Sequence, residues 1–311
     1  MQLSDRIGRR MKLQDLHVLM AVVQAGSMGK AARHLNTSQP NISKSIADLE
    51  HALGVRLLDR HRQGIEPTES GRALLDCGVA VFDELRQGLK NIEFLNDPTA
   101  GEVRIGSIAP LATSFISAVI DRLSRRYPRI AFHLVTAQPS TLQRELSERG
   151  IDLFIARSPI ADERLAFEFL FEDSFVVAAG AQSPWVRRRK IELAELENEP
   201  WVLPPSESLI GSIASDAFRA SGLRHPRVTV VTLTPEVRIS LLATGRFVTI
   251  VPASALRFPT NRSELKVLPV ELPIARVPNG IFTLKSRTLS PIAQLFIETA
   301  REVAKHLAKR K

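Results

Sequence analysis

The stretch AGSMGKAARHLNTSQPNISKSIADLEHALGVRLLDRHRQGIEPTESGRALL, residues 25–75, decides the fold of the N-terminal part of the chain. Its apolar residues recur at helical spacing in two runs, first Met28, Ala31, Ala32 and Leu35, then Ile42, Ile46, Leu49 and Leu53. The turn NTSQP separates the runs, with Ser38 suited to cap the second helix and Pro40 to stand in its first turn. An earlier amphipathic helix runs from Leu13 and stops at Gly26, and Ser27 is placed to cap the helix that follows. The pattern predicts three short helices, the last two joined by a tight turn.

The outward faces of the second and third helices are polar and basic. At about 100° per residue, Lys44 points away from the apolar side of the third helix, and Gln39 and Asn41 stand near its start. Lys30 and Arg33 face outward on the second helix. Amides can read adenine edges and ammonium groups can pair with phosphate or guanine, so this geometry suits a helix that enters the DNA major groove. A plain three-helix packing unit, whose polar face only keeps it soluble, would show the same pattern.

The charge distribution favours a polyanionic partner. The net charge is +9 and the isoelectric point is about 10.2. Residues 1–65 hold 10 Lys or Arg against 5 Asp or Glu, so a fifth of the length carries more than half of the excess. Nucleic acid or an anionic membrane surface would suit such an end. A single cysteine and no apolar run near the ~18 residues of a membrane helix favour the reduced cytoplasm, with no membrane association.

The whole stretch resembles the helix-turn-helix and wing of LysR-type transcriptional regulators. The resemblance rests on the SQP turn, the following Ser-Lys pair, the I-x-x-L-E-x-x-L-G helix end, the L-L-x-R strand and the T-x-x-G start of the next helix. It implies a mainly α winged helix-turn-helix domain over residues 1–67 that binds double-stranded DNA, with wing strands at 57–60 and 65–67. The DNA-binding residues that we expect are Arg33, Thr37, Ser38, Gln39, Pro40, Asn41, Ser43, Lys44 and, at the wing tip, Arg62. The leader before the first helix is longer than is usual in the family, so Met1 and Met11 are both candidate starts.

A long helix is predicted to follow the wing. Thr68 can cap it, and residues 69–95 contain no proline. An apolar stripe at heptad spacing suits packing against a partner helix and consists of Leu75, Phe82, Leu85, Leu89 and Ile92. An amphipathic helix lying on its own chain's core would show the same periodicity. The family resemblance favours a dimerisation helix in a linker over residues 68–96, and so a homodimer or homotetramer. Cys77 is interpreted as a packing residue.

Turn-forming residues 96–101 precede a second domain in which strands and helices alternate. The expected strands are VRIGS, IAFHLV, DLFIA, SFVVAA, WVL, VTVV, VTIV and GIFTL, with helices at 111–126, 141–149, 213–220, 235–243 and 291–309. This alternation is typical of an α/β fold. It resembles the LysR-type effector domain, which has the type 2 periplasmic-binding-protein fold. The resemblance implies a domain over 101–311, with lobe I at about 101–169 and 275–311 and lobe II at about 170–274.

Ligands of open α/β sheets sit outside the carboxyl ends of the strands, where helix N-termini favour anions. Four such loops are expected to converge, at residues 107–110, 138–141, 206–211 and 234–236. The predicted ligand-binding residues are Ser107, Pro110, Ser140, Thr141, Ser206, Ser208 and Thr234. They suit a small, anionic effector, although each hydroxyl taken singly is more often a helix cap. Arg157 is a possible anion partner or a member of a structural ion pair.

Other classes of protein fit the sequence less well. The motifs of serine hydrolases, zinc peptidases and P-loop enzymes are missing and the seven histidines lack ligand spacing, so we expect no catalytic residues, no metal and no cofactor. A free solute-binding protein would have no use for a helix-turn-helix. The expected function is therefore a metabolite-sensing, LysR-type transcriptional regulator. The alternative is a DNA-binding protein whose C-terminal domain is only structural or oligomerising.

Overall fold

The computed structural model describes residues 11–61, 64–157, 160–256 and 265–308, with side chains described as far as residue 305. The chain divides into two compact units, Met1–Leu89 and Lys90–Lys311. The boundary falls inside a long helix rather than at the predicted hinge, because the last turns of this helix pack with the second unit.

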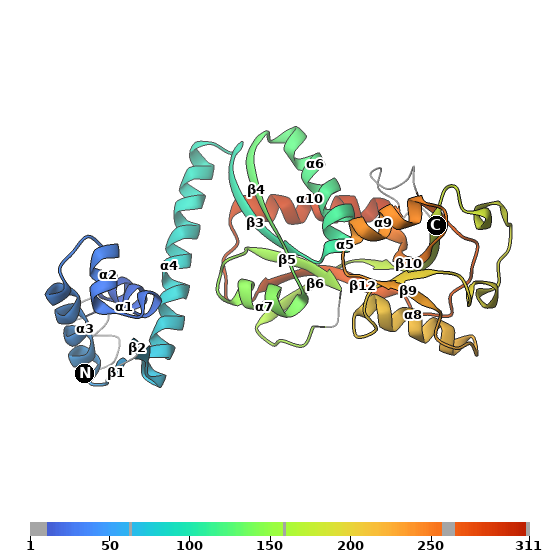
Figure 1. The fold of residues 1–311 in the computed structure, drawn as a ribbon. Coiled ribbons are helices and arrows are strands. Elements are labelled where there is room, and N and C mark those ends of the chain that lie inside the picture. The colour runs from blue at the N-terminus through green and yellow to red at the C-terminus, as the bar shows by residue number, and fades with distance from the viewer. Residues whose placement is uncertain (1–10, 62–63, 158–159, 257–264, 309–311) are drawn as a thin grey trace. The chain divides into compact units, whose positions relative to one another are not determined.

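The first unit is built on three helices, α1 (Leu13–Ala25), α2 (Met28–His34) and α3 (Gln39–Leu53) (Figure 1). The capping chemistry follows the sequence: Ser27 Oγ accepts a hydrogen bond from Lys30 N, and Ser38 Oγ from Asn41 N. Gly26 and Gly54 end α1 and α3 in the left-handed conformation. The apolar residues that face one another form one core, among them Leu19, Val22, Ala31, Ile42, Ile46 and Leu49.

A two-stranded antiparallel wing follows, formed by β1 (Leu58–His61) and β2 (Gly64–Pro67). Its register pairs Leu58 with Pro67 and His61 with Gly64. The strands lie within one residue of the predicted ones. Arg62, predicted at the wing tip, lies outside the described residues.

The long helix α4 (Glu69–Asn96) begins at the wing. Thr68 caps it, since its Oγ1 accepts from Gly71 N at 3.0 Å and donates to Arg56 O at 2.8 Å. Gly71 and Gly78 are buried where α4 meets the rest of the first unit.

The predicted stripe of α4 is divided between two environments. Leu75 packs on the core of the first unit, and the ring of Phe82 lies 5.7 Å from that of His17. The other three members, Leu85, Leu89 and Ile92, are exposed in the single chain. Leu75 and Phe82 are therefore half-buried within their own chain, and Leu85, Leu89 and Ile92 are the members of the predicted stripe that the single chain leaves exposed. The interpretation of Cys77 as a packing residue is wrong for the single chain, because this cysteine is exposed.

Lobe I of the second unit is a three-layer sandwich around a five-stranded sheet of order β4-β3-β5-β12-β6. The strands are β3 (Ala100–Ser107), β4 (Arg129–Thr136), β5 (Leu153–Arg157), β6 (Leu165–Asp173) and β12 (Val277–Leu284). The helices are α5 (Ala109–Leu111), α6 (Ser117–Arg126), α7 (Pro139–Ser147) and α10 (Pro291–Ala308). Figure 1 shows α6 and α10 together on one face, where they share a core with β3 and β5, while α7 covers the other face.

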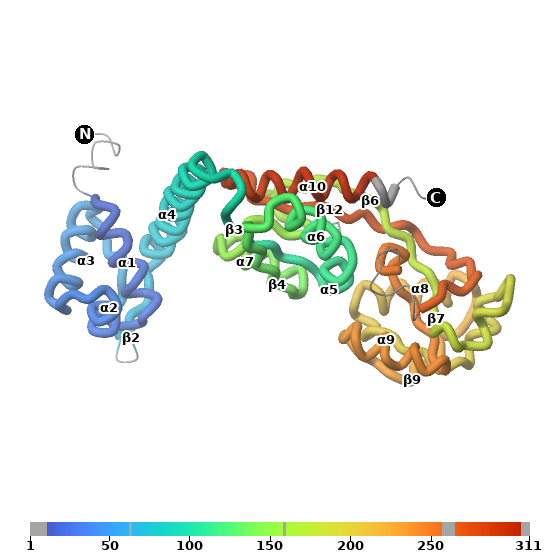
Figure 2. Tube along the Cα trace, turned by 90° about the horizontal axis from the view of Figure 1, so that it is seen from above, coloured from blue at the N-terminus to red at the C-terminus, as the bar shows by residue number. Residues whose placement is uncertain are grey.

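Lobe II has a second five-stranded sheet, of order β11-β7-β10-β8-β9. Its strands are β7 (Phe175–Gly180), β8 (Trp201–Leu203), β9 (Val228–Val231), β10 (Val248–Pro252) and β11 (Leu265–Val267). Helix α8 (Leu209–Ala220) packs on one face around Trp201 and Phe218, and α9 (Pro235–Ala243) packs on the other through Leu242. Short 3₁₀ turns lie at Pro184–Arg187, Leu193–Leu196 and Ala253–Leu256. The chain crosses into this lobe after β6 and returns before β12 (Figure 2).

Three features differ from the sequence prediction. β6 and β11 were not predicted, and β6 carries lobe I to Asp173 rather than to residue 169. The single helix expected over 111–126 is interrupted by a π-helical segment, Ala112–Ile116, in which the Ser117 N–H bonds to Ala112 O. Such segments are uncommon and are frequent at functional sites.

Candidate functional site

The first candidate site is the outward face of α3 with the end of α2. The predicted residues of this face are exposed, with Ser43 half-buried: Arg33, Thr37, Ser38, Gln39, Pro40, Asn41 and Lys44. They lie on α2, on α3 and on the turn between these helices, where Asn36 adopts φ 49°. The turn therefore presents a compact polar surface around the start of α3.

The side chains of this surface differ in their freedom to contact a partner. Ser38 Oγ caps α3, and Asn41 Nδ2 donates to Thr37 Oγ1 at 3.2 Å. Within the described residues, Gln39 and Lys44 make no side-chain hydrogen bond or ion pair. Their polar groups remain available for base edges or phosphates, while Ser38 and Thr37 hold the backbone that presents them.

Ser45 and Glu50 hold α3 in place, and neither was predicted from the sequence to have this role. Ser45 Oγ donates to Asp15 Oδ1 of α1 at 2.7 Å. Glu50 Oε1 accepts from the backbone N–H groups of Leu57 at 2.7 Å and Leu58 at 3.2 Å, which fixes the start of the wing against α3. The Leu-Glu pair in the I-x-x-L-E-x-x-L-G motif could have indicated the role of Glu50, but the motif was interpreted only as the end of a helix.

The wing is also joined to the turn between α1 and α2. Ile65 N donates to Gly26 O at 3.2 Å. Gly64 adopts φ 147°, with its Cβ position 3.3 Å from the same carbonyl oxygen. A side chain at position 64 would be strained in this conformation. Glycine at this position therefore allows the wing strand to lie close to the turn between α1 and α2.

The second candidate site lies at the carboxyl ends of the parallel strands in lobe I. β3 pairs in parallel with β4 and β5, and Ala137 N donates to Ser107 O at 3.1 Å, so the predicted loops 107–110 and 138–141 are adjacent. Ser140 is exposed and Thr141 half-buried at the start of α7. Ser107 is fully buried, and its Oγ lies 3.2 Å from both Ile108 O and Ile155 O. Ser107 was predicted to contact the ligand, but its hydroxyl is buried and faces two backbone carbonyl oxygens of lobe I.

The corresponding loops of lobe II also lie side by side. β8 is parallel to β9, and Thr232 N donates to Leu203 O at 3.0 Å. Ser208 Oγ accepts from Gly211 N at 3.2 Å and donates to Pro205 O at 2.6 Å, which is the helix-cap role that the sequence left open. Ser206 and Thr234 are exposed.

One cavity, of about 360 Å³, has walls from both lobes. Lobe I contributes three residues of the α5–α6 region, Pro110, Thr113 and Ser117. Lobe II contributes Pro235, Glu236, Arg238, Ile239, Leu242, Val251, Pro252, Ala255, Leu256 and Leu265. It takes in Pro110 but none of the predicted hydroxyl residues. Two of the four predicted loops, 107–110 and 234–236, therefore share a cavity.

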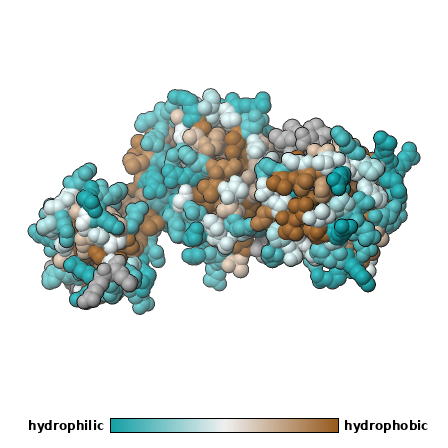
Figure 3. Space-filling model, in the orientation of Figure 1, coloured by the Kyte–Doolittle hydropathy of each residue, from teal (hydrophilic) through white to brown (hydrophobic). Residues whose placement is uncertain are grey.

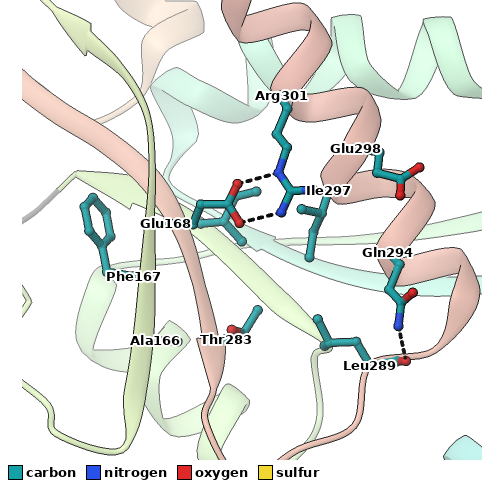
Figure 4. A pocket seen from close by; sticks show the side chains of 10 residues that line it. Ala166, Phe167, Glu168, Thr283, Leu289, Gln294, Ile297, Glu298 and Arg301 are labelled. Carbon is teal, nitrogen blue, oxygen red and sulfur yellow. Dashed lines mark hydrogen bonds and ion pairs between the residues drawn. The ribbon is translucent and has the colours of Figure 1, made fainter.

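A second cavity, of about 500 Å³, lies between β6, β12 and α10 (Figure 4). Its arginine is already paired: Arg301 Nε and Nη2 donate to the two carboxylate oxygens of Glu168 at 2.6 and 2.8 Å. The pairing lowers the pKa of Glu168. This cavity therefore offers no unpaired cation to an anionic ligand.

Arg157 ends β5 beside the segment that crosses between the lobes. It is 8 % exposed, its guanidinium lies 5.7 Å from the Phe175 ring, and its Nε and Nη2 have no hydrogen-bond partner in the described structure. Burial lowers the pKa of Arg157 to about 10, and the charge of Asp173 opposes this shift. Asp173 itself accepts from Ser254 N and Oγ.

Within the described residues, no group of three or more His, Cys, Asp or Glu side chains is arranged to hold a metal ion. Among the described helices, none is both long and apolar enough to cross a membrane.

Comparisons with known proteins agree with this architecture. The family described as "Bacterial regulatory helix-turn-helix protein, lysR family" matches residues 13–72, and "LysR substrate binding domain" matches residues 96–305. The chain is 26 % identical over 295 residues to the HTH-type transcriptional regulator GbpR of Azospirillum brasilense, covering 94 % of this chain and 86 % of the relative.

Solved structures of similar fold include full-length proteins. OxyR from Pseudomonas aeruginosa aligns with a TM-score of 0.65 at 20 % identity, over 95 % of this chain and 97 % of that one. Full-length CbnR in complex with its target DNA aligns with a TM-score of 0.54 at 23 % identity, over 94 % of this chain and 100 % of that one.

Proposed function

The chain belongs to the LysR family of transcriptional regulators, and from this premise we propose which of its residues bind DNA and where it senses its effector. As a member of this family it combines a helix-turn-helix DNA-binding domain with an effector-binding domain. We propose boundaries of 1–67 for the DNA-binding domain, 68–96 for the linker helix and 101–311 for the effector domain. We further propose that it acts in the cytoplasm, where its DNA partner is, and that it is not an enzyme.

The exposed start of α3 carries the proposed DNA interface. Gln39 and Lys44 have free polar groups, whereas Asn41 and Thr37 bond to one another. An amide can bond bidentately to adenine, and an ammonium group pairs with phosphate as a point charge. Gln39 is therefore proposed as a base reader and Lys44 as a phosphate contact, with Arg33 on the neighbouring helix. Arg62 of the wing is proposed on family resemblance.

Substitutions at these two positions should cause two different kinds of loss. Lys44→Ala is expected to weaken binding to all duplexes and to reduce the slope of log K against log salt by about 0.9. Gln39→Ala is expected to cost ~1 to 3 kcal/mol on the operator alone and to relax discrimination at one base pair. Fluorescence titrations against operator and scrambled duplexes at several salt concentrations measure both effects.

A matched control removes an equal charge far along the chain. Lys266 is exposed in lobe II, so Lys266→Ala should leave operator affinity and salt slope unchanged. If Gln39→Ala weakens operator and scrambled DNA equally, Gln39 is not a base-reading residue. If the salt slope of Lys44→Ala equals that of the wild type, Lys44 does not contact a phosphate.

We propose that the effector binds between the lobes, at the carboxyl ends of the parallel strands. The support is the adjacency of the loops within each lobe and the exposure of Ser140, Ser206 and Thr234 at helix starts. Thr141, Ser208 and Pro110 complete the proposed lining. Helix N-termini provide free N–H groups and a favourable dipole end, which suit an anionic effector.

Blocking these loops should remove the response to the effector without removing DNA binding. A thermal-shift screen first identifies a stabilising metabolite, since a ligand that binds the folded protein raises its melting temperature. Operator affinity is then measured with and without that metabolite in the wild type, Ser140→Leu and Ser206→Leu. We expect the variants to lose the ~5- to 150-fold ligand-induced change typical of allosteric coupling while basal affinity stays near wild type. A full response in both variants would contradict the proposed cleft, and a screen without any stabilising metabolite would favour a purely structural C-terminal domain.

A further inference from the structure

The 360 Å³ cavity contains a charged group without a partner. Arg238, on α9, lines the cavity and is only 6 % exposed. Its Nε and Nη1 atoms are buried and have no hydrogen-bond partner in the described part of the structure. Burying a cation without pairing it is costly, and native proteins normally avoid it. The position of Arg238 therefore calls for an anion that the described residues do not provide.

The nearest acidic residue does not fill this role. Glu236 stands two residues before Arg238, in the first turn of α9, and also lines the cavity, but its side chain makes no ion pair with Arg238 within 4.0 Å. Burial lowers the pKa of Arg238, and the charge of Glu236 opposes the shift only as the lesser cause. An arginine stays protonated despite such a shift, so the cavity keeps a fixed positive charge.

The other walls of the cavity are mostly apolar. Lobe II supplies Ile239, Leu242, Val251, Leu256 and Leu265, and the face of α9 turned toward the viewer in Figure 3 lies in an apolar patch. A volume of about 360 Å³ falls within the range of small-molecule sites, ~300 to 1,000 Å³. An inorganic anion or a sugar would leave these walls uncovered. A molecule with one anionic end and an apolar body would pair with Arg238 and also cover the apolar walls.

The lobe I wall belongs to the irregular start of the α5–α6 region. Thr113 lies in the π-helical segment, and Ser117 follows it. Both hydroxyls are bonded to carbonyls of their own segment, Thr113 Oγ1 to Ala109 O and Ser117 Oγ to Ala112 O. They therefore shape the wall rather than compete with Arg238 for an anion.

We propose that this cavity binds a small monocarboxylic acid with an aryl or short alkyl body, whose carboxylate pairs with the guanidinium of Arg238. The inference deepens the proposed sensing function and rests on it for its regulatory meaning. It also moves the anion from the predicted hydroxyl loops to α9. A guanidinium presents parallel N–H donors that match the two oxygens of a carboxylate, which favours this anion over a neutral group.

The test uses the full chain and two probe acids, phenylacetate and hexanoate, in isothermal titration calorimetry. At least one of them is expected to bind the wild type. Its uncharged amide, phenylacetamide or hexanamide, should bind at least tenfold more weakly, and inorganic phosphate should give no heat. Arg238→Met should weaken the acid at least tenfold, which corresponds to about 1.4 kcal/mol.

Two further variants separate binding from folding. Arg219→Met removes an exposed arginine of the same lobe and should leave the affinity unchanged. Ala255→Leu adds bulk to the cavity wall while keeping Arg238, and should also block the acid. Without ligand, Arg238→Met should melt at or above the wild-type temperature, because it replaces an unpaired buried cation with an apolar side chain of similar length.

Binding of the acid that is lost in Arg238→Met and Ala255→Leu but kept in Arg219→Met supports the site. If that acid leaves operator binding unchanged, the site stands and its regulatory role fails. If neither acid binds the wild type at millimolar concentration, or if Arg238→Met binds as tightly as the wild type, the proposal is overturned. Sensing of another metabolite at the hydroxyl loops would survive that result.

Discussion

The substitution Leu89→Glu is expected to separate the assembled protein into monomers and to weaken binding to a two-half-site operator by at least a hundredfold. In the single chain Leu85, Leu89, Ile92 and Leu95 are 48, 61, 57 and 80 % exposed. Their spacing of three and four residues places them along one side of α4, so they form an apolar face that the described part of the chain leaves uncovered. We propose that this face pairs with a second copy of the chain. A glutamate in such a seam would be desolvated without a partner.

The size of the effect on DNA binding follows from linking two recognition helices. Joining two binding modules can raise overall affinity ~10² to 10⁴-fold over either alone. Light scattering and titrations against one-half-site and two-half-site duplexes measure assembly and affinity. Affinity for one half-site should change little, since Leu89 lies on α4 and is not part of the polar surface at the start of α3.

The controls use the division of α4 between its two environments. Ala73 is exposed near the start of α4 and lies about 160° around the helix from Leu89, so Ala73→Glu should leave assembly intact. Phe82→Glu should instead destabilise the N-terminal unit, because Phe82 packs beside His17 of the same chain. A wild-type protein that is monomeric at micromolar concentration, or a Leu89→Glu variant that still assembles, would contradict the proposed seam.

The substitution Gly71→Ala is expected to lower the free energy of unfolding of the N-terminal unit by about 3 kcal/mol, at the upper end of overpacking costs. A Cβ at position 71 would lie 2.0 Å from Leu57 O and 3.3 Å from Pro67 Cβ. Leu57 O also accepts the Thr68 N–H at 3.0 Å, so this carbonyl cannot move without breaking the start of α4. The wing and α4 would have to separate, and operator binding should fall with the stability.

Gly88 supplies a matched control in the same helix. The Cβ position of Gly88 meets nothing within 4 Å, so Gly88→Ala should stabilise α4 by ~0.5 to 1 kcal/mol. Urea unfolding followed by circular dichroism compares the two variants with the wild type. A stability of Gly71→Ala within ~0.5 kcal/mol of the wild type, the usual scatter of surface substitutions, would mean that the wing relaxes freely. In that case Gly71 is not a constraint on the fold.

The amino-acid sequence was enough for the helices of the first unit and for most strands of the second. α1, α2, α3 and the wing follow from apolar spacing, from the caps Ser27 and Ser38 and from the resemblance to the family. One omission was avoidable: β6 reads LAFEFLFED, and its alternation of Leu165, Phe167, Phe169 and Phe171 is a strand pattern that went unused. β11 has only three residues, too few for a periodicity to be visible.

The sites were harder to predict than the elements. The polar residues at the start of α3 could be named because a helix places its own neighbours by a fixed rotation per residue. Ser107 could not be judged in this way. Its hydroxyl is buried against two carbonyl oxygens, and one of them, Ile155 O, belongs to a strand 48 residues further along the chain.

What the sequence by itself determined is local: which segments are helical, where they start, and which side chains share a face. What only the tertiary structure decided is which polar groups find partners. Asn41 and Ser208 are occupied, Gln39 and Lys44 are free, and Arg238 is buried without an anion. The physical reason is that satisfaction of a buried or interfacial polar group depends on contacts between segments far apart in sequence, and these contacts leave no periodic trace in the chain.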